Sequence, residues 1–270
     1  MITAIVVLYK MKPEESKTYQ NLLKYTKEQQ GMIKNVVIYD NSPTRCEEIS
    51  LPEGYIYIHD STNDGLAKAY NYAFEVAKEA QSKWLWLFDQ DTDLEKTFLN
   101  KSIQEAQSEA EEKIASIVPY IRSNNKVVSP VFADTIRPLV EELPKIGLQN
   151  KKVMAINSGS LVSVEFLKKI NGFNLEFPID YLDHWFYHRI FEEGYTVDVI
   201  NCTIDHELSL MTPKEVSDER YLQILTYEKK YYEKYNQELF PAYKKHLKKR
   251  YLKNLLVDRK KAKLIAKMMK

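Results

Sequence analysis

Short apolar runs rich in Val, Ile and Tyr recur through the first two hundred residues of the chain. Continuous apolar runs of this length are typical of strands that are covered on both faces. The pattern therefore predicts a sheet buried between layers of helices. The runs lie at 2–9, 35–40, 55–60, 83–89, 114–121 and 153–163.

Helical patterns separate several of these runs, at 12–30, 65–81 and 97–112. Pro13 and the acids after it suit a helix N-terminus. The order strand, helix, strand, strand, helix, strand predicts an open α/β sheet. In such sheets ligands bind outside the carboxyl ends of the strands. A stripe on the second helix consists of Leu66, Tyr70, Ala73, Phe74 and Ala77.

The last fifty-odd residues have a different character, because they are helical in pattern and rich in lysine. Pro241 is expected to interrupt the helix. From Lys244 onward there are twelve Lys and Arg against one acid, Asp258, while the whole chain has a net charge of +1. We therefore divide the chain into an α/β catalytic domain, 1–212, and a helical, basic, amphipathic extension, 213–270.

Composition excludes several classes of protein. The chain has 270 residues, 44% of them hydrophobic, so it can bury a sizeable core as one large or two small domains. Its two cysteines have no zinc-ligand spacing. It has neither a P-loop nor a GxGxxG motif. The N-terminus has no signal-peptide pattern and no window reaches the length of a membrane span, so we expect a cytoplasmic protein.

The segment WLWLFDQDTD, residues 84–93, runs from a buried strand directly into alternating acids. Asp89 and Asp91 can converge in the turn after the strand. Hard divalent cations such as Mg²⁺ take carboxylate oxygens together with substrate phosphates. The alternative is a solvated turn in which Thr92 or Asp93 caps the next helix. Other acids at strand ends, Asp40 and Asp60, favour the metal site.

Two further loops follow predicted strands. In YDNSP, Asp40 can accept hydrogen bonds from a base or a ribose, or it can simply stabilise a turn. In TNDGLAKAYNYA, Asn63 and Gly65 lie where a loop enters a helix, and Lys68 adds a positive charge. A helix N-terminus offers free N–H groups to an anion. The alternative is an ordinary helix cap.

Taken in order, the motifs AIVVLYK, VVIYDNS, NDGLAKAYNYA, WLFDQDT, INSGSLVS, FPIDYLDHWFYHR and DHELS carry a resemblance to a known family. The chain resembles family 2 glycosyltransferases with the GT-A fold, a Rossmann-like open mixed sheet flanked by helices. It is most similar to rhamnosyltransferase-like members that build bacterial surface polysaccharides. The resemblance covers residues 3 to 209.

The resemblance implies roles for the residues that match the family pattern. Asp40 would hold the base or ribose of the donor. The donor loop would comprise Asn63, Gly65, Ala67 and Lys68. Asp89 and Asp91 would bind the metal, and Asp89 and Gln90 would also contact the donor.

The segment IDYLDHWFYHR resembles the part of the family that carries the catalytic base. Asp183 lies six residues before Arg189, an interval found in many members, although Leu182 occupies the usual Glu position. Asp183 is therefore the predicted base, with Asp180 in reserve. An inverting transfer needs one carboxylate to take the proton of the acceptor hydroxyl. The alternative is a helix start with aspartate caps and an aromatic core.

Two other segments receive roles from the resemblance. His206, after the run TVDVINCTI, would reach the metal or the pyrophosphate, although a lone histidine is as often structural. The segment INSGSLVS would line the acceptor and donor-sugar pocket. Its alternative is a tight strand bend made possible by glycine. The predicted acceptor contacts are Asn157, Ser158, Gly159, Asp180 and Trp185.

Wound as one helix, the C-terminal segment presents an apolar stripe flanked by Lys and Arg. A basic amphipathic helix is typical of membrane-surface elements. The alternatives are packing on the catalytic domain or on a second copy of the chain, and binding of nucleic acid, which we do not expect. The stripe comprises Leu247, Tyr251, Leu252, Leu255, Leu256, Leu264, Ile265 and Met268.

The resemblance thus implies an inverting glycosyltransferase that depends on Mg²⁺ or Mn²⁺. The expected donor is dTDP-rhamnose, and the expected acceptor is a glycan or lipid-linked sugar of a capsule, O-antigen or cell wall. The expected location is the inner face of the plasma membrane. Three alternatives remain: a UDP-sugar enzyme of the same fold (galactofuranose, galactose or glucose), a nucleotidyltransferase, and a sugar-binding or scaffold protein without catalysis.

Overall fold

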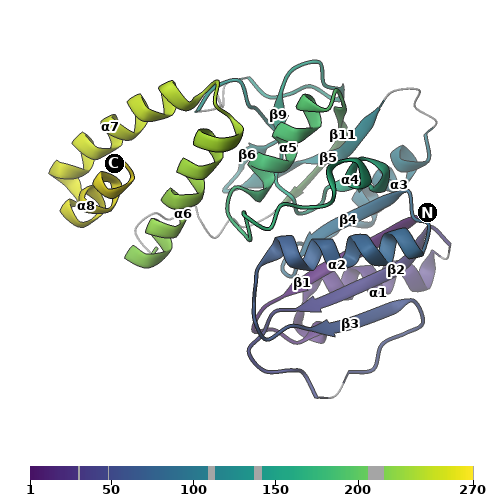
Figure 1. Cartoon of the computed structure of the whole chain (residues 1–270). Coiled ribbons are helices and arrows are strands. Elements are labelled where there is room, and N and C mark those ends of the chain that lie inside the picture. Colours follow the sequence, from purple (N-terminus) through teal and green to yellow (C-terminus); the bar gives the residue numbers. More distant parts are fainter. Residues whose placement is uncertain (30, 48, 109–112, 137–141, 206–215, 270) are drawn as a thin grey trace.

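We describe the protein from a computed structural model, which covers residues 1–29, 31–47, 49–108, 113–136, 142–205 and 216–269. A mixed sheet of nine strands forms its centre, in the order β3-β2-β1-β4-β10-β5-β11-β8, with β6 paired to β5 (Figure 1). The first four strands in this order are parallel, whereas β10 is antiparallel to β4 and β5. The predicted open mixed α/β sheet is therefore confirmed. Its strands are β1 (Ile2–Leu8), β2 (Ile33–Asp40), β3 (Tyr55–His59), β4 (Trp84–Asp89), β5 (Ile114–Ser123), β6 (Lys126–Ser129), β8 (Gly147–Leu148), β10 (Leu161–Ser163) and β11 (Thr196–Asp205).

The central strands are buried on both faces, because helices cover both sides of the sheet. In β4, Leu85 and Leu87 belong to one core cluster, while Trp86 and Phe88 belong to the other. Helices α1 (Lys17–Glu28) and α3 (Lys96–Gln107) pack on the second of these faces. The first face is covered by α2 (Leu66–Glu79), α4 (Val164–Ile170) and α5 (Leu182–Glu192).

The apolar run 153–163 forms two short strands instead of one. β9 (Val153–Met154) pairs with β7 (Val131–Phe132) in a separate two-stranded sheet, while β10 joins the main sheet. The chain turns between them at Gly159, whose φ of +86° lies in the left-handed region that glycine adopts without strain. A Cβ at this position would meet the Cδ1 atom of Ile204 at 2.8 Å.

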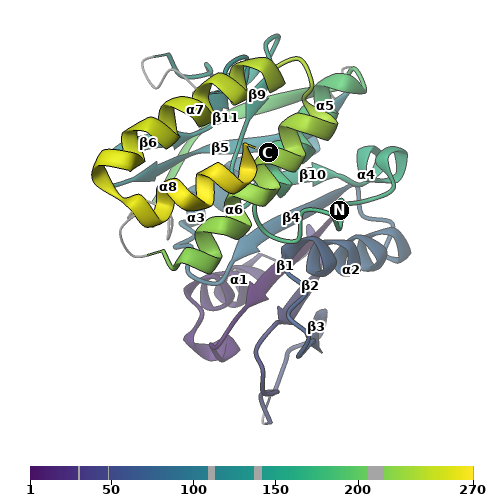
Figure 2. The same ribbon diagram turned by 60° about the vertical axis from the view of Figure 1, so that its left-hand side comes forward.

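The C-terminal region is helical, as predicted, but it is not one continuous helix. Pro241 lies in the first turn of α7 (Phe240–Val257), where a proline needs no N–H partner. Asp258 ends α7 and caps α8 (Arg259–Met268), because its carboxylate accepts bonds from the N–H groups of Lys260 and Lys261 at 3.1 Å. The only acid of the basic segment thus divides it into a helical hairpin (Figure 2).

The C-terminal helices share their core with the sheet. α6 (Asp218–Lys230) continues into a π-helical turn (Tyr231–Tyr235), and both contribute to the larger core cluster. Arg250 of α7 donates to both carboxylate oxygens of Glu228 of α6, at 2.7 and 2.8 Å. The predicted boundary at 212/213 lies outside the described residues. Among the helices that the structure describes, none combines the length and the apolar character needed to cross a bilayer.

Candidate functional site

Strands β1, β2 and β4 are parallel, so their carboxyl ends lie at the same edge of the sheet (Figure 1). In β1, Val7 pairs with Asp89 of β4 and Leu8 pairs with Asp40 of β2. The two acids are therefore separated by one strand, or about 10 Å. This arrangement confirms that the acids at these two strand ends meet at one edge.

A pocket of about 750 Å³ lies between the loops that follow β1 and β2. Its volume is within the range of small-molecule sites. The main-chain N–H of Lys10 donates to Oγ of Ser42 at 2.7 Å and so joins the two loops. The lining carries both signs of charge. Its cations are Lys10, Lys12 and Arg45, and its acids are Glu14, Glu15, Asp40 and Glu47. Sequence reasoning did not single out the three cationic residues, although their position directly after strands was a usable signal.

Asp40 is 2% exposed and its carboxylate is engaged by the protein itself. One oxygen accepts from the N–H of Ser42 at 2.8 Å, and the other accepts from the hydroxyl of Tyr57 at 2.6 Å. Burial is the largest cause that raises the pKa of Tyr57 to about 12, and the bond to Asp40 adds to it. Asp40 thus shapes the pocket wall, and direct contact with a base stays a prediction.

The turn after β4 is held by its main chain. The N–H of Asp89 donates to Oγ of Ser158 at 3.0 Å, and its carbonyl accepts from the hydroxyl of Thr18 at 2.6 Å. Gln90 accepts from the N–H of Tyr9 through its side-chain oxygen at 2.8 Å. Gln90 therefore connects this turn to the end of β1, which gives it a structural role beside its predicted donor contact.

The carboxylates of Asp89 and Asp91 suit a hard divalent cation, because both supply oxygen ligands. Asp89 is half-buried at the strand end, and Asp91 is exposed in the following turn. Among the described residues, no group of three or more His, Cys, Asp and Glu side chains is placed so that it could hold a metal ion. His206, the third predicted ligand, lies outside the described residues.

The predicted donor loop meets another part of the protein at the start of α2. Gly65 has a φ of +95°, and a Cβ there would approach the carbonyl oxygen of Pro178 to 2.4 Å. The N–H of Ala67 donates to the same oxygen at 3.1 Å. The Ala67 N–H is therefore already paired within the protein, and contact of this loop with the donor stays a prediction. Asn63 is exposed beside it, with a φ of +50°.

Lys68 forms ion pairs with Asp60 and Asp64, at 2.8 and 2.7 Å. The hydrogen bonds to the two acids raise the pKa of Lys68. Burial of Asp60 opposes its ionisation, but bonds from Lys68, Thr62 and Tyr39 outweigh burial and lower its pKa. The ammonium group of Lys68 is therefore already paired within its own loop. A contact with the donor would require it to break its ion pairs with Asp60 and Asp64.

Asp180 is paired with a residue that the sequence did not suggest. Asp180 is 8% exposed. Its carboxylate accepts hydrogen bonds from both terminal nitrogens of Arg220 on α6, one of them at 2.7 Å. Burial raises the pKa of Asp180, and the guanidinium partly offsets that rise. Asp180 is thus a poor candidate for contact with an acceptor, because it connects the loop before α5 to the C-terminal helices.

Asp183 lies in the first turn of α5, where the helix N-terminus favours a negative charge. Tyr181, just before the helix, has a φ of +64°, a conformation that non-glycine residues adopt rarely and often at functional sites. Asp183 is half-buried, and one of its oxygens accepts from the N–H of His184 at 2.8 Å. Arg189 turns to Glu192 and Glu193 near the other end of α5.

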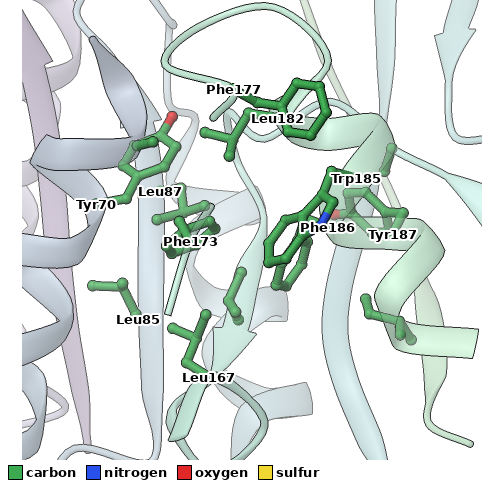
Figure 3. Close-up of a cluster of buried hydrophobic side chains, with 14 of the residues drawn as sticks. Tyr70, Leu85, Leu87, Leu167, Phe173, Phe177, Leu182, Trp185, Phe186 and Tyr187 are labelled. Atoms are coloured by element: carbon green, nitrogen blue, oxygen red, sulfur yellow. The ribbon is translucent and has the colours of Figure 1, made fainter. Parts of the chain in front are cut away.

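Tyr70 of α2 interacts electrostatically with two of these carboxylates, those of Asp89 and Asp183. Its sequence position indicated only that it belongs to the apolar stripe of α2. It is fully buried, and its hydroxyl has no hydrogen-bond partner among the described residues. Burial raises the pKa of Tyr70, and the charges of Asp89 and Asp183 raise it further. Figure 3 shows its hydroxyl pointing toward the segment that carries Phe177 and Leu182. The charges of the predicted metal ligand Asp89 and of the predicted base Asp183 thus both act on this phenol.

The turn 156–160 packs against β4 instead of lying open. Ser158 is 1% exposed and its hydroxyl is within 3.0 Å of the Thr92 hydroxyl. The carbonyl of Gly159 accepts from Nε1 of Trp86 at 3.1 Å. Ser158 and Gly159 therefore have structural roles, and their contact with the acceptor stays a prediction. Asn157 differs, because its Oδ1 is buried with no partner among the described residues.

Trp185 lies in the core between the sheet and α5, together with Phe173, Phe186 and Tyr187 (Figure 3). It is 6% exposed, and its Nε1 has no hydrogen-bond partner among the described residues. The side chain of Trp185 thus faces the protein interior, and its contact with an acceptor stays a prediction. Helical position alone could not distinguish the two faces of this aromatic helix.

The open mixed sheet, with acids at the carboxyl ends of its parallel strands, has the GT-A fold of nucleotide-sugar glycosyltransferases. Residues 4–171 match the family model described as glycosyl transferase family 2. Because this match covers more than half of the chain, the protein belongs to that family.

Individual relatives are more distant. The chain is 26% identical over 216 residues to dTDP-rhamnosyl transferase RfbF of Shigella flexneri. The matched region covers 74% of this chain and 66% of that relative, so this chain spans slightly under two thirds of the relative's length. Among solved structures, TarS 1-349 of S. aureus in complex with UDP-GlcNAc has a TM-score of 0.51 at 16% identity, covering 83% of this chain and 65% of that one. GalNAc-T7 with UDP, GalNAc and Mn²⁺ has a TM-score of 0.55 at 12% identity, covering 85% and 48%. At these identities the structures show the fold alone.

Proposed function

We propose that the protein is an inverting, metal-dependent glycosyltransferase that moves a sugar from a nucleotide donor to a hydroxyl group of a glycan or lipid-linked acceptor. One observation carries the proposal most directly. Strands β2 and β4 bring the carboxyl groups of Asp40 and Asp89 to one edge of the sheet, where Asp40 lines a pocket of about 750 Å³. Family membership supports the type of reaction.

Asp183 would act as the general base. It would take the proton of the acceptor hydroxyl while the hydroxyl oxygen forms a bond to C1 of the donor sugar. The bond from C1 to the diphosphate breaks at the same time, and its electrons leave with the nucleoside diphosphate. A positioned base contributes about 10²- to 10⁴-fold to such a step.

Asp89 and Asp91 would hold a divalent cation, Mg²⁺ or Mn²⁺. When bound, the cation would neutralise charge on the diphosphate leaving group. The nucleotide itself would bind in the pocket of about 750 Å³, where Lys10, Lys12 and Arg45 offer positive charge near Asp40. Lys10, Lys12 and Arg45 would pair with the phosphates of the donor, in a pocket whose lining also holds the acids Glu14, Glu15, Asp40 and Glu47.

The proposed donor is dTDP-rhamnose. The support is the similarity to a protein named as a dTDP-rhamnosyl transferase. A UDP sugar is the second candidate, since two proteins of the same fold are described with UDP-GlcNAc or with UDP. Both candidates share the diphosphate and differ in the base and sugar.

The proposed acceptor belongs to a capsule, O-antigen or cell-wall polysaccharide. We further propose that the enzyme works at the inner face of the plasma membrane and meets it through its basic C-terminal helices. Twelve Lys and Arg from Lys244 onward would be attracted to anionic lipid. Self-association through these helices is the competing proposal.

The test is a thermal-shift experiment with dTDP, dTDP-rhamnose and UDP sugars, each with Mn²⁺ or Mg²⁺ and then with EDTA. A ligand that binds only the folded state raises the melting temperature by mass action. We expect dTDP ligands to stabilise the protein only when the metal is present. Stabilisation by UDP sugars instead would show that the donor is a UDP sugar and not dTDP-rhamnose. No response to any nucleotide would contradict the transferase proposal.

A further inference from the structure

A groove of about 340 Å³ lies between the C-terminal helices α6, α7 and α8. Aromatic and aliphatic side chains form much of its wall, including Phe240, Leu247 and Met268. Helices α7 and α8 lie side by side, and α6 contacts α8 (Figure 2). The groove is therefore a feature of the packed extension and involves none of the acids at the sheet edge.

Positive charge dominates this groove. Lys229, Lys244 and Lys248 line it, against a single acid, Glu233. None of the three lysines forms an ion pair within the described part of the chain, and Nζ of Lys244 lies 4.7 Å from the centre of the Phe240 ring. Apolar walls with unpaired ammonium groups fit a ligand that is anionic at one end and apolar at the other.

The groove continues into a row of exposed side chains on α7. Lys244, Lys248, Leu252 and Leu256 follow one another at intervals of four residues, so each lies beside the next in a row that winds slowly around the helix. Leu252 is 61% exposed and Leu256 is 91% exposed, and Val257 beside them is 74% exposed. Grouped exposed apolar residues of this kind mark an interaction surface.

The apolar stripe that the sequence indicated is divided in the structure, because Leu252 and Leu256 are exposed while other members are buried. Leu247 and Ile265 of that stripe are 2% and 0% exposed, because they hold α7 and α8 to the protein core. Figure 1 shows the turn between α7 and α8 at the end of the extension that points away from the sheet. The exposed leucines near this turn are thus presented to a partner outside the chain.

We propose that this face binds the surface of an anionic lipid bilayer. Leu252, Leu256 and Val257 enter the interface, and a lipid phosphate lies between Lys244 and Lys248 with its apolar part toward the groove. The inference rests on the proposed function, to which it adds the surface and lipid chemistry of the membrane contact. A second copy is a weaker occupant, because a twofold interface would bring the same lysine-rich face against itself.

The test uses the full chain and sedimentation with vesicles. One set contains phosphatidylcholine alone, and the other contains phosphatidylcholine and phosphatidylserine at about two to one. We expect binding to the anionic vesicles that weakens with added salt. Lys244→Gln with Lys248→Gln, and separately Leu252→Ser with Leu256→Ser, should each lower the partition coefficient about tenfold.

A matched control removes the same charge elsewhere. Lys24→Gln with Lys27→Gln changes two exposed lysines of α1, and we expect it to retain most of the binding. Equal loss in this control, equal binding to neutral vesicles, or no binding at all would overturn the proposal. So would sedimentation velocity that shows a wild-type dimer and a monomeric Leu252→Ser, Leu256→Ser variant.

The nucleotide experiment separates this proposal from the transferase proposal. Variants of the α7 face should keep the wild-type thermal shift with dTDP and metal, because the face lies on a different element from the strand-end acids. If the wild type binds anionic vesicles but no nucleotide, the lipid surface stands and the transferase proposal fails. If it binds nucleotide but no vesicles, the reverse holds.

Discussion

At the residue scale, Asp91 and Asp183 act at different stages of the proposed reaction. Asp91→Asn removes one of the two carboxylates available to the cation, so we expect donor binding and turnover to weaken together. Asp183→Asn removes the base but leaves the donor site intact. We expect turnover to fall about 10²- to 10⁴-fold with little change in the affinity for the donor.

Isothermal titration with the donor and an assay of nucleotide release measure these two quantities. Asp93→Asn, in the same turn as Asp91, is a suitable control, because Asp93 is exposed and its carboxylate accepts from the side chain of Asn21 at 3.1 Å. An Asp183→Asn protein that keeps most of its activity would remove Asp183 from the base role.

Tyr70 supports a second prediction at this scale. A buried hydroxyl without a partner costs about 1–3 kcal/mol, so Tyr70→Phe should leave the free energy of unfolding unchanged or raise it by about 1 kcal/mol. Turnover should nevertheless fall about tenfold, since the charges of Asp89 and Asp183 both act on this phenol.

Tyr187→Phe is the matched control. Its hydroxyl contacts the hydroxyls of Ser160 and Ser116 at 3.0 and 3.2 Å, so its loss should destabilise the protein by about 1 kcal/mol. Chemical denaturation compares the two variants directly. A Tyr70→Phe protein that loses as much stability as Tyr187→Phe would show that Tyr70 is a bonded core residue.

At the scale of elements, the start of α2 depends on the loop that contains Pro178. We expect Gly65→Ala to lower the free energy of unfolding by about 2 kcal/mol or more, because the added Cβ would lie 2.4 Å from the Pro178 carbonyl at a positive φ. Gly194→Ala is the control, since φ there is also positive, +70°, but nothing lies within 4 Å. Equal losses in the two variants would mean that backbone strain alone decides, and that α2 does not press on this loop.

At the scale of the whole molecule, Asp198 makes stability depend on pH. Asp198 of β11 is 6% exposed, and burial, reinforced by Glu105 of α3, raises its pKa from 3.8 to about 6. The folded protein therefore holds this proton more tightly than the unfolded chain. Stability from this group is present at low pH and is lost as the pH rises from about 4 to about 6.

Asp198→Asn should remove this loss. We expect the variant to be more stable than the wild type by about 1–2 kcal/mol at neutral pH, with a smaller difference near pH 4. Thermal unfolding across this range measures both. Asp205→Asn, whose side chain is 68% exposed in its pair with Arg122, should change little. A wild-type protein that is more stable than Asp198→Asn at neutral pH would contradict the raised pKa of Asp198.

The sequence indicated the architecture well, because the hydrophobic pattern of a strand is a local property. The alternation of side chains along β4 and the acids at its end both follow from residues that are adjacent in the chain. The run 153–163 was predicted less well, since its short strands belong to different sheets. The residue roles at the site were predicted from motifs. Motifs do not show which polar atoms are already paired with other groups of the protein.

The sequence by itself thus determined the order of strands and helices and the chemical types available at the sheet edge. These features depend only on residues that are close together in the chain, namely the hydrophobic periodicity, the acids at strand ends and the basic C-terminal segment. Only the tertiary structure decided that Arg220 binds Asp180, that the Pro178 carbonyl takes the Ala67 N–H, and which leucines of α7 are exposed. The physical reason is that burial and pairing are set by contacts between segments far apart in the chain, and no local pattern carries that information.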